Sequence, residues 1–128
     1  MSSGRVYDGF LPGRYQFDAY GNGGFRFADM SHRGSLLALP SGVRAWPVAS
    51  MADLTDEVLD PIFAEGDALD LLLFGTGLDI AALPTAFRAR FREAGIGIDV
   101  MQTGAAARTY NVLLAENRKV GAALIAVA

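Results

Sequence analysis

Between Leu69 and Val127 the sequence alternates three apolar runs with two helical patterns. The first run, LDLLLFGTG, is continuously apolar and is closed by glycine, which is typical of a strand buried on both faces. The runs IGIDVMQ and KVGAALIAV are expected to be the next two strands. Because strands that alternate with helices pair in parallel through right-handed crossovers, this part of the chain predicts a sheet covered by helices.

The two segments between these runs have helix signals. In LPTAFRARFREAG, Pro84 suits a first helical turn, Phe87 and Phe91 lie four residues apart, and Gly95 ends the pattern. The second helix is TGAAARTYNVLLAEN. Thr103 is its predicted N-cap residue, because a threonine hydroxyl at that position accepts a hydrogen bond from a free backbone N–H.

The N-terminal half has shorter elements. Residues 1–18 have no helical or strand period, so they are expected to form an irregular arm that covers the core through Tyr7, Phe10, Tyr15 and Phe17. A short helix is predicted over residues 53–64, with acidic residues at its start and Pro61 kinking or ending it. Short turn-rich separators favour an antiparallel meander of three strands, at about residues 25–27, 35–39 and 43–46.

Length and hydropathy indicate one domain. The chain has 128 residues, of which 52% are hydrophobic, so it has the usual size of a single domain and can bury a core. We expect an arm over residues 1–18 and an α/β core over residues 19–128. No run reaches the ~20 apolar residues of a membrane span, and the first residues lack a secretory signal pattern. The expected location is cytoplasmic, and peripheral association with a membrane stays open.

The net charge and the scarcity of reactive side chains exclude several classes of function. A net charge of −3, with Lys119 as the single lysine, argues against a nucleic acid partner, which requires clustered cations. The absence of cysteine and the single histidine, His32, exclude disulfides, a thiolate metal site, a cysteine nucleophile and a multi-histidine metal centre. We expect no cofactor and no metal.

No catalytic constellation is visible. The acidic residues between Asp53 and Asp60 are interpreted as a solvated helix start, and Asp99 lies within a strand pattern. His32 lies in an expected turn, where a histidine is usually exposed, and no serine occupies a sharp turn from strand to helix. The glycines at 21–24 open a strand rather than a helix, so they indicate a bend with close backbone approach and not a dinucleotide loop.

Two glycine-bearing corners at strand ends form a candidate ligand site. The carboxyl ends of neighbouring parallel strands face one crevice, and free N–H groups at a helix start favour an anion. Helical spacing places Arg108 and Asn111 on the side of Gly104. The candidate residues are Gly75, Thr76, Gly77, Thr103, Gly104, Arg108 and Asn111. In the simpler interpretation, Thr103 only caps the helix, Arg108 is solvated and Asn111 bonds a loop.

Several motifs resemble a known family. LLLFGTG, the LP-initiated helix followed by GIGIDVM, and above all TGAAARTYNVLLAENRKVGAALIAV are similar to a small domain family of unknown biochemical function. The family occurs in bacteria, archaea and eukaryotes, and its branches include an adipogenesis-associated domain protein and a mitochondrial assembly factor of respiratory complex I (NADH:ubiquinone oxidoreductase). The likeness extends from about Tyr20 to Val127. It implies a three-layer α/β/α sandwich with a mixed, mainly parallel central sheet, joined by the N-terminal antiparallel meander.

The resemblance also implies a function. It suggests a chaperone-like or scaffolding role in building a membrane respiratory enzyme, with a respiratory-complex subunit or assembly intermediate as the protein partner. Family members often have an acid before the Thr-Gly and a cysteine before the Arg-Thr-Tyr-Asn, where this chain has Gln102 and Ala107. A role that needs a carboxylate or thiol at those positions is therefore not carried over.

Two hypotheses of different classes follow. The first is a non-enzymatic interaction protein resembling an assembly factor. The second is a small-anion or metabolite-binding protein, or an enzyme, that uses the crevice at the strand ends. The oligomeric state stays open, because the sequence does not decide whether the last strand is central or lies at an edge of the sheet.

Overall fold

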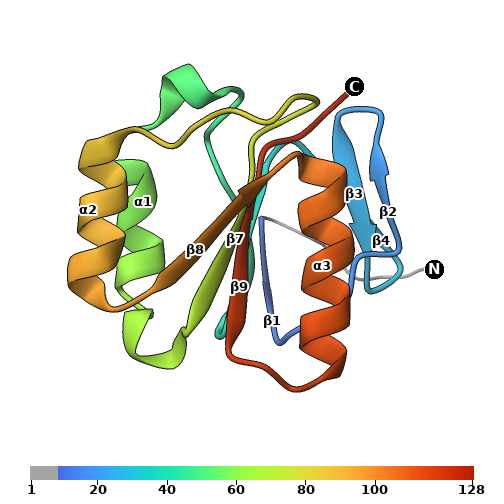
Figure 1. Ribbon diagram of the computed structural model, residues 1–128. Helices are drawn as coiled ribbons and strands as arrows, with labels where there is room; N and C mark the ends of the chain where they lie inside the picture. The colour runs from blue at the N-terminus through green and yellow to red at the C-terminus, as the bar shows by residue number, and fades with distance from the viewer. Residues whose placement is uncertain (1–8) are drawn as a thin grey trace.

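The computed structural model describes residues 9–128, which form three layers around a six-stranded mixed sheet (Figure 1). The strands, in spatial order, are β1 (Phe10–Pro12), β6 (Gly42–Ala45), β5 (Leu36–Leu39), β9 (Val120–Leu124), β7 (Leu71–Gly75) and β8 (Gly97–Met101). Strands β9, β7 and β8 are parallel to one another, and the other neighbours are antiparallel. The expected layered α/β fold with a mixed sheet is confirmed, although its parallel part is confined to these three strands.

The last strand, β9, is central. Ala122 pairs with Ala38 of β5 on one side and with Leu73 of β7 on the other. Every residue of β9 is buried, and a Cβ added at Gly121 would come within 2.9 Å of the Leu69 side chain. The small side chains of this strand therefore let both faces of the sheet be covered closely. In the described part of the chain, β1 and β8 form the edges of this sheet.

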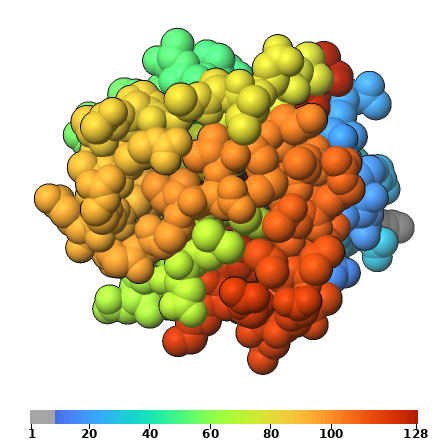
Figure 2. Space-filling model, in the orientation of Figure 1, coloured from blue at the N-terminus to red at the C-terminus, as the bar shows by residue number. Residues whose placement is uncertain are grey.

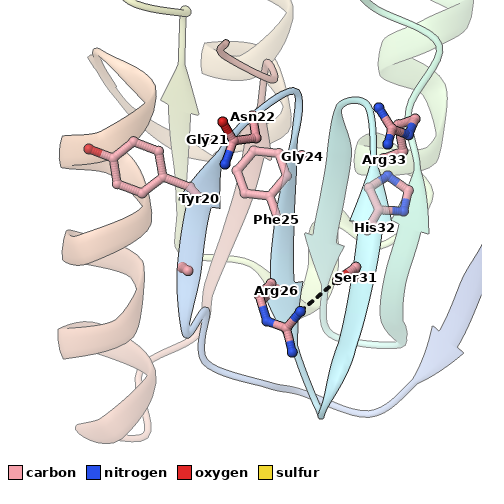
Figure 3. Close-up of a pocket in the computed structure, with 10 residues that line it drawn as sticks. Tyr20, Gly21, Asn22, Gly24, Phe25, Arg26, Ser31, His32 and Arg33 are labelled. Carbon is pink, nitrogen blue, oxygen red and sulfur yellow. Dashed lines mark hydrogen bonds between the residues drawn. The ribbon is translucent and has the colours of Figure 1, made fainter.

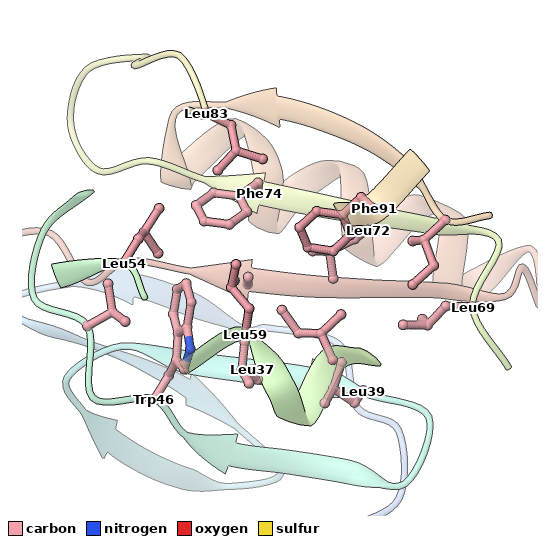
Figure 4. Close-up of a cluster of buried hydrophobic side chains, with 14 of the residues drawn as sticks. Leu37, Leu39, Trp46, Leu54, Leu59, Leu69, Leu72, Phe74, Leu83 and Phe91 are labelled. Atoms are coloured by element: carbon pink, nitrogen blue, oxygen red, sulfur yellow. The ribbon is translucent and has the colours of Figure 1, made fainter. Parts of the chain in front are cut away.

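One face of the sheet is covered by α1 (Asp56–Phe63) and α2 (Thr85–Ala94) (Figure 4). Arg90 of α2 donates hydrogen bonds to the carboxylates of Asp56, at 3.1 Å, and Asp60, at 2.6 Å. The acidic cluster lies at the start of α1 and its side chains are largely exposed, as expected, and these two members also form ion pairs with α2. The core beneath includes Leu37, Trp46, Leu59, Leu72, Phe74 and Phe91.

Helix α1 begins later than the sequence suggested. Thr55 is its N-cap, and the threonine hydroxyl accepts a hydrogen bond from the Val58 N–H at 3.3 Å. Pro61 lies inside the last turn, and the helix ends at Phe63. Two single-turn 3-10 helices flank it, at Met51–Asp53 and Gly66–Ala68.

The opposite face of the central sheet is covered by α3 (Thr103–Ala115) and by a separate three-stranded antiparallel sheet. Aromatic side chains join the two, because the Phe17 ring lies 5.4 Å from the Tyr110 ring and 5.8 Å from the Phe25 ring. Burial is the main cause that raises the pKa of Tyr110, and the nearby Arg14 opposes this effect. The strands of the small sheet are β2 (Ala19–Gly21), β3 (Gly24–Phe27) and β4 (Met30–Arg33).

The expected N-terminal meander is divided between the two sheets. The run at 25–27 belongs to β3, whereas the runs at 35–39 and 43–46 became β5 and β6 of the central sheet. The arm is not wholly irregular, because Phe10–Pro12 pairs with β6. Of the aromatic residues expected to cover the core, Phe17 is buried, Phe10 is 39% exposed, and Tyr7 lies outside the described residues.

The turn expected around His32 is absent, and a tight turn lies earlier, between β2 and β3. Asn22 and Gly23 have positive φ angles and form the tight turn between β2 and β3. A Cβ added at Gly24 would overlap the carbonyl oxygen of His32, so the predicted close backbone approach is confirmed. His32 itself lies in β4 and is buried, with its Nε2 atom 2.9 Å from the Ser35 carbonyl oxygen. The prediction of an exposed histidine in a turn is therefore wrong.

The surface over α2, β8 and α3 is shown in Figure 2. None of the helices within residues 9–128 has the length and apolar character needed to cross a membrane.

Candidate functional site

The two glycine-bearing strand ends lie side by side. Gly75 pairs with Met101 across β7 and β8, and the Thr76 N–H donates to the Met101 carbonyl oxygen at 3.0 Å. The corners are also joined reciprocally. The Thr103 N–H donates to the Gly77 carbonyl oxygen at 2.9 Å, and the Gly77 N–H donates to the Thr103 hydroxyl at 3.0 Å. The arrangement predicted for these two corners is confirmed.

Thr103 joins α3 to the loop after β7 and to the segment after β9 by hydrogen bonds, and it is not the N-cap of α3. It is fully buried, and its hydroxyl donates to the carbonyl oxygen of Ile125, after β9, at 2.7 Å. The N-cap is Gln102, whose side chain makes no capping bond, so the prediction that Thr103 is the N-cap is wrong. Thr103 is instead the first helical residue, and its N–H, one of the donors that a helix start leaves free, bonds the Gly77 carbonyl oxygen. Gly75 permits this contact, since a Cβ there would lie 2.9 Å from the Thr103 Cα atom.

Thr76 organises the loop that follows β7. Its hydroxyl donates to the Asp79 carbonyl oxygen at 2.7 Å and accepts the Ala81 N–H at 3.1 Å. The residue is 7% exposed. The hydroxyl therefore has partners within its own loop, in the manner of a turn-forming threonine.

Gly104 is covered by Tyr20 from the small sheet. A Cβ added at Gly104 would overlap the Tyr20 hydroxyl, so the glycine makes room for this ring. Arg108, one turn further along α3, is exposed, with its Nη1 atom 3.5 Å from the same hydroxyl. The close approach expected at Gly104 is thus made by another part of the chain.

Asn111 holds the N-terminal arm. Its side-chain oxygen accepts the Phe17 N–H at 2.7 Å, and its side-chain nitrogen donates to the Phe17 carbonyl oxygen at 2.8 Å. Gln16 adds a third bond to the Asn111 carbonyl oxygen at 3.0 Å. The simpler interpretation of Asn111, in which it bonds a loop, is confirmed.

A depression of about 390 Å³ lies beside the corner and contains only part of the predicted site. Thr76 and Gly77 line it, together with Met51, Leu78 and Asp79 among others. None of the described residues that line it is an arginine or lysine, so it lacks the positive charge that an anion favours. The predicted residues therefore divide between this corner, the contact with Tyr20 and the contact with Phe17. Ligand binding by these residues stays a prediction.

A second depression, of about 400 Å³, lies on the three-stranded sheet (Figure 3). Tyr20 lines one edge of it with its ring directed toward α3, whereas Arg26 and Arg33 extend from β3 and β4. We use the name arginine face for the residues of the three-stranded sheet that line this depression on the side away from the core: Ala19, Gly21, Gly24, Arg26, Ser31 and Arg33. The sequence analysis missed this surface, because it depends on the strand register. The alternation in Gly-Phe-Arg-Phe and Ser-His-Arg was the signal that could have found it.

The arginine face differs from other parts of the surface in its charge pairing. The Arg26 Nη1 atom donates to the Ser31 hydroxyl at 2.9 Å, and neither Arg26 nor Arg33 forms an ion pair with a carboxylate of residues 9–128. By contrast, Arg44 and Arg90 each have carboxylate partners.

The fold and its corner define a small α/β sandwich domain in which buried polar residues at the strand ends join β7, α3 and β9. The chain belongs to the family described as "Protein of unknown function (DUF498/DUF598)", whose model matches residues 17–125. This result confirms the family suggested by the sequence motifs.

Relatives extend this assignment. An uncharacterized protein of Rhodobacter capsulatus is 41% identical over 113 residues, which cover 88% of this chain and 86% of that protein. The mouse protein NADH dehydrogenase (ubiquinone) 1 alpha subcomplex assembly factor 3 is 31% identical over 115 residues. That match covers 90% of this chain but 62% of the mouse protein. A crystal structure from Bartonella henselae, described as an outer membrane protein, has 50% identity and a TM-score of 0.88, covering 91% of this chain and 98% of that one.

Proposed function

We propose that this chain is a non-enzymatic interaction protein that acts through its surface, in the manner of an assembly factor. One observation carries the proposal. The polar groups at the strand ends, where α/β domains hold small ligands, are bonded within the chain through Thr76 and Thr103. The 31% identity to the mouse assembly factor supports the same role.

The proposed partner is a protein subunit or assembly intermediate of a respiratory complex. We also propose that the chain is cytoplasmic and meets its partner at a membrane surface. A nucleic acid is not among the proposed partners. The net charge of −3 fits this choice, because phosphate backbones require clustered cations over a wide surface.

An exposed apolar loop supports a protein partner. Leu78 and Ile80 lie between β7 and α2, and they are 68% and 67% exposed. This loop runs over the outer surface in Figure 2, where residues near 80 are yellow. Contiguous exposed apolar surface is typical of protein contact sites.

Affinity capture tests the proposal. The tagged full chain, incubated with a membrane extract prepared under native conditions, is expected to recover respiratory-complex subunits or an assembly intermediate. The variant Leu78→Ser with Ile80→Ser should recover less of them if the loop contributes. Val112→Ser, which removes another apolar side chain that is 57% exposed, serves as the matched control. Recovery of no respiratory-complex protein above the level of an untagged sample would contradict the proposal.

A further inference from the structure

The arginine face has a floor without side chains. In the small sheet Gly21 pairs with Gly24, and Gly24 pairs with Arg33. In the next outward-facing row, Arg26 lies between Ala19 and Ser31. Because directly paired residues point to the same side of an antiparallel sheet, the two rows form one surface. A Cβ added at Gly21 would meet nothing within 4 Å, so this glycine leaves the surface open beside Arg33, whereas Gly24 is buried against the His32 carbonyl oxygen.

The spacing of the arginines suits recognition of carboxylates. Arg26 and Arg33 are diagonal neighbours on adjacent strands, and the Cβ atoms of such neighbours are roughly 7–8 Å apart. Their guanidinium groups are long enough to act on the same short acidic segment. Each guanidinium presents a planar set of donors that matches a carboxylate with two bonds. The single bond from Arg26 to Ser31 leaves its other donors for such a contact.

The surrounding charge favours the same ligand. Two acidic residues lie next to the small sheet, Asp18 before β2 and Asp29 in the turn between β3 and β4, and neither lines the depression or forms an ion pair with Arg26 or Arg33. The arginine face is therefore a local positive region on a chain whose net charge is −3. Within residues 9–128 no carboxylate neutralises either arginine, so an external anion is the complementary partner.

We propose that the arginine face binds an acidic segment of the partner protein, rich in Asp or Glu and extended over the glycine floor. The inference rests on the proposed function, because it assigns a surface and a chemistry to the same protein partner. An extended segment fits this site, since the floor is an open part of the outer surface and not an enclosed cavity. Two arginines are also too few to follow a nucleic acid backbone.

A peptide titration tests the site directly. Hexaglutamate is added to the ¹⁵N-labelled full chain, and backbone amide and arginine Nε shifts are followed by NMR. The expected changes are confined to Gly21, Gly24, Arg26, Ser31 and Arg33. Raising the salt from about 10 mM to about 150 mM should weaken binding, because the screening length falls from about 30 Å to about 8 Å. Changes centred on another surface would overturn the proposal.

Variants separate this face from general charge effects. Arg26→Gln with Arg33→Gln should weaken hexaglutamate binding by about tenfold, because two exposed charge-assisted contacts are lost. Arg92→Gln with Lys119→Gln removes the same charge from two exposed residues elsewhere and should change the affinity much less. Equal weakening by both pairs would overturn the proposal, since binding would then follow only net charge. Near-ultraviolet circular dichroism of each variant checks that it is folded.

Two further measurements distinguish an acidic protein segment from a small inorganic anion as the ligand of the arginine face. Inorganic phosphate is expected to bind more weakly than hexaglutamate, and equal affinity would replace the peptide site by a small-anion site. In the capture experiment, Arg26→Gln with Arg33→Gln should lose the partners that the wild-type chain recovers, while the control pair keeps them. If the wild-type chain recovers partners and the variant retains them, this inference fails and the proposed function stands. If the wild-type chain recovers none, the proposed function fails, and the peptide titration shows whether the arginine face still selects acidic segments.

Discussion

The strand-end corner and the arginine face use their polar side chains in opposite ways. At the corner, the Thr103 hydroxyl is buried and bonded on both sides, to Gly77 and to Ile125. On the arginine face, Arg26 and Arg33 are exposed and have no carboxylate partner within residues 9–128. The corner has the glycine and threonine pattern that suggests a ligand loop, yet its polar groups mainly hold the fold together. The less distinctive sequence of the small sheet leaves its charges available to a partner.

The largest effect on stability is expected at Thr103. Thr103→Ala removes the hydroxyl that bonds the Gly77 N–H and the Ile125 carbonyl group, and it leaves both groups without that partner. Because an unsatisfied buried polar group costs about 1–3 kcal/mol, the free energy of unfolding should fall by roughly 2–4 kcal/mol. Urea denaturation followed by circular dichroism measures this difference.

Two substitutions at the same position separate the hydroxyl from the volume of the side chain. Thr103→Val keeps the shape and should be destabilising to a similar degree, whereas Thr103→Ser keeps the hydroxyl and should lose much less. If the variant Thr103→Val is as stable as the wild type, then the hydrogen bonds of the Thr103 hydroxyl do not stabilise the corner. The contrast with the arginine face would in that case disappear.

A smaller effect is expected at Gly75. Gly75→Ala places a Cβ atom 2.9 Å from the Thr103 Cα atom, which is backbone and cannot move aside cheaply. Overpacking of this kind costs about 1–3 kcal/mol. Thermal and urea unfolding of the variant would measure the loss.

Gly66→Ala is the control for the general effect of replacing glycine by alanine. Its added Cβ atom would meet the end of the Ile96 side chain at 3.4 Å, which is close to ordinary contact. We expect it to be near neutral, because alanine also reduces the freedom of the unfolded chain. Equal losses at both glycines would show that the tight joint between β7 and α3 has no special role.

These sites show which parts of the structure the sequence could predict. Local patterns were sufficient from Leu69 onward, where the runs became β7, α2, β8, α3 and β9. They also placed Gly75 beside Thr103, because parallel strands bring their carboxyl ends together. The contact of Tyr20 with Gly104 was missed, since it joins segments far apart in the chain.

The other differences have the same origin. His32 was expected in a turn, and its burial follows from pairing with Phe25 across β3 and β4. The N-cap was placed at Thr103, but the helix begins there and the Thr103 N–H and hydroxyl bond segments distant in the sequence. The arginine face depends on a strand register that no single run of residues determines. Propensity gives the elements of this fold, whereas contacts between distant segments decide which polar groups remain available.

Asn111 should have an intermediate effect. Asn111→Ala removes two hydrogen bonds to the Phe17 backbone, so the free energy of unfolding should fall by about 1–2 kcal/mol. Amide hydrogen exchange at Phe17 should become faster, because the arm loses its attachment to α3. Val112→Ala, on the exposed side of the same helix, is the control and should leave this exchange unchanged. Unaltered protection of Phe17 in Asn111→Ala would mean that the aromatic contacts alone hold the arm.

The smallest effect on stability is expected on the arginine face. Arg26→Gln with Arg33→Gln should change the free energy of unfolding by no more than about 0.5 kcal/mol, because both residues are exposed and form no ion pair within residues 9–128. Urea denaturation measures it beside Thr103→Ala. A loss as large as that of Thr103→Ala would mean that these arginines support the small sheet, and the contrast between the corner and the arginine face would disappear.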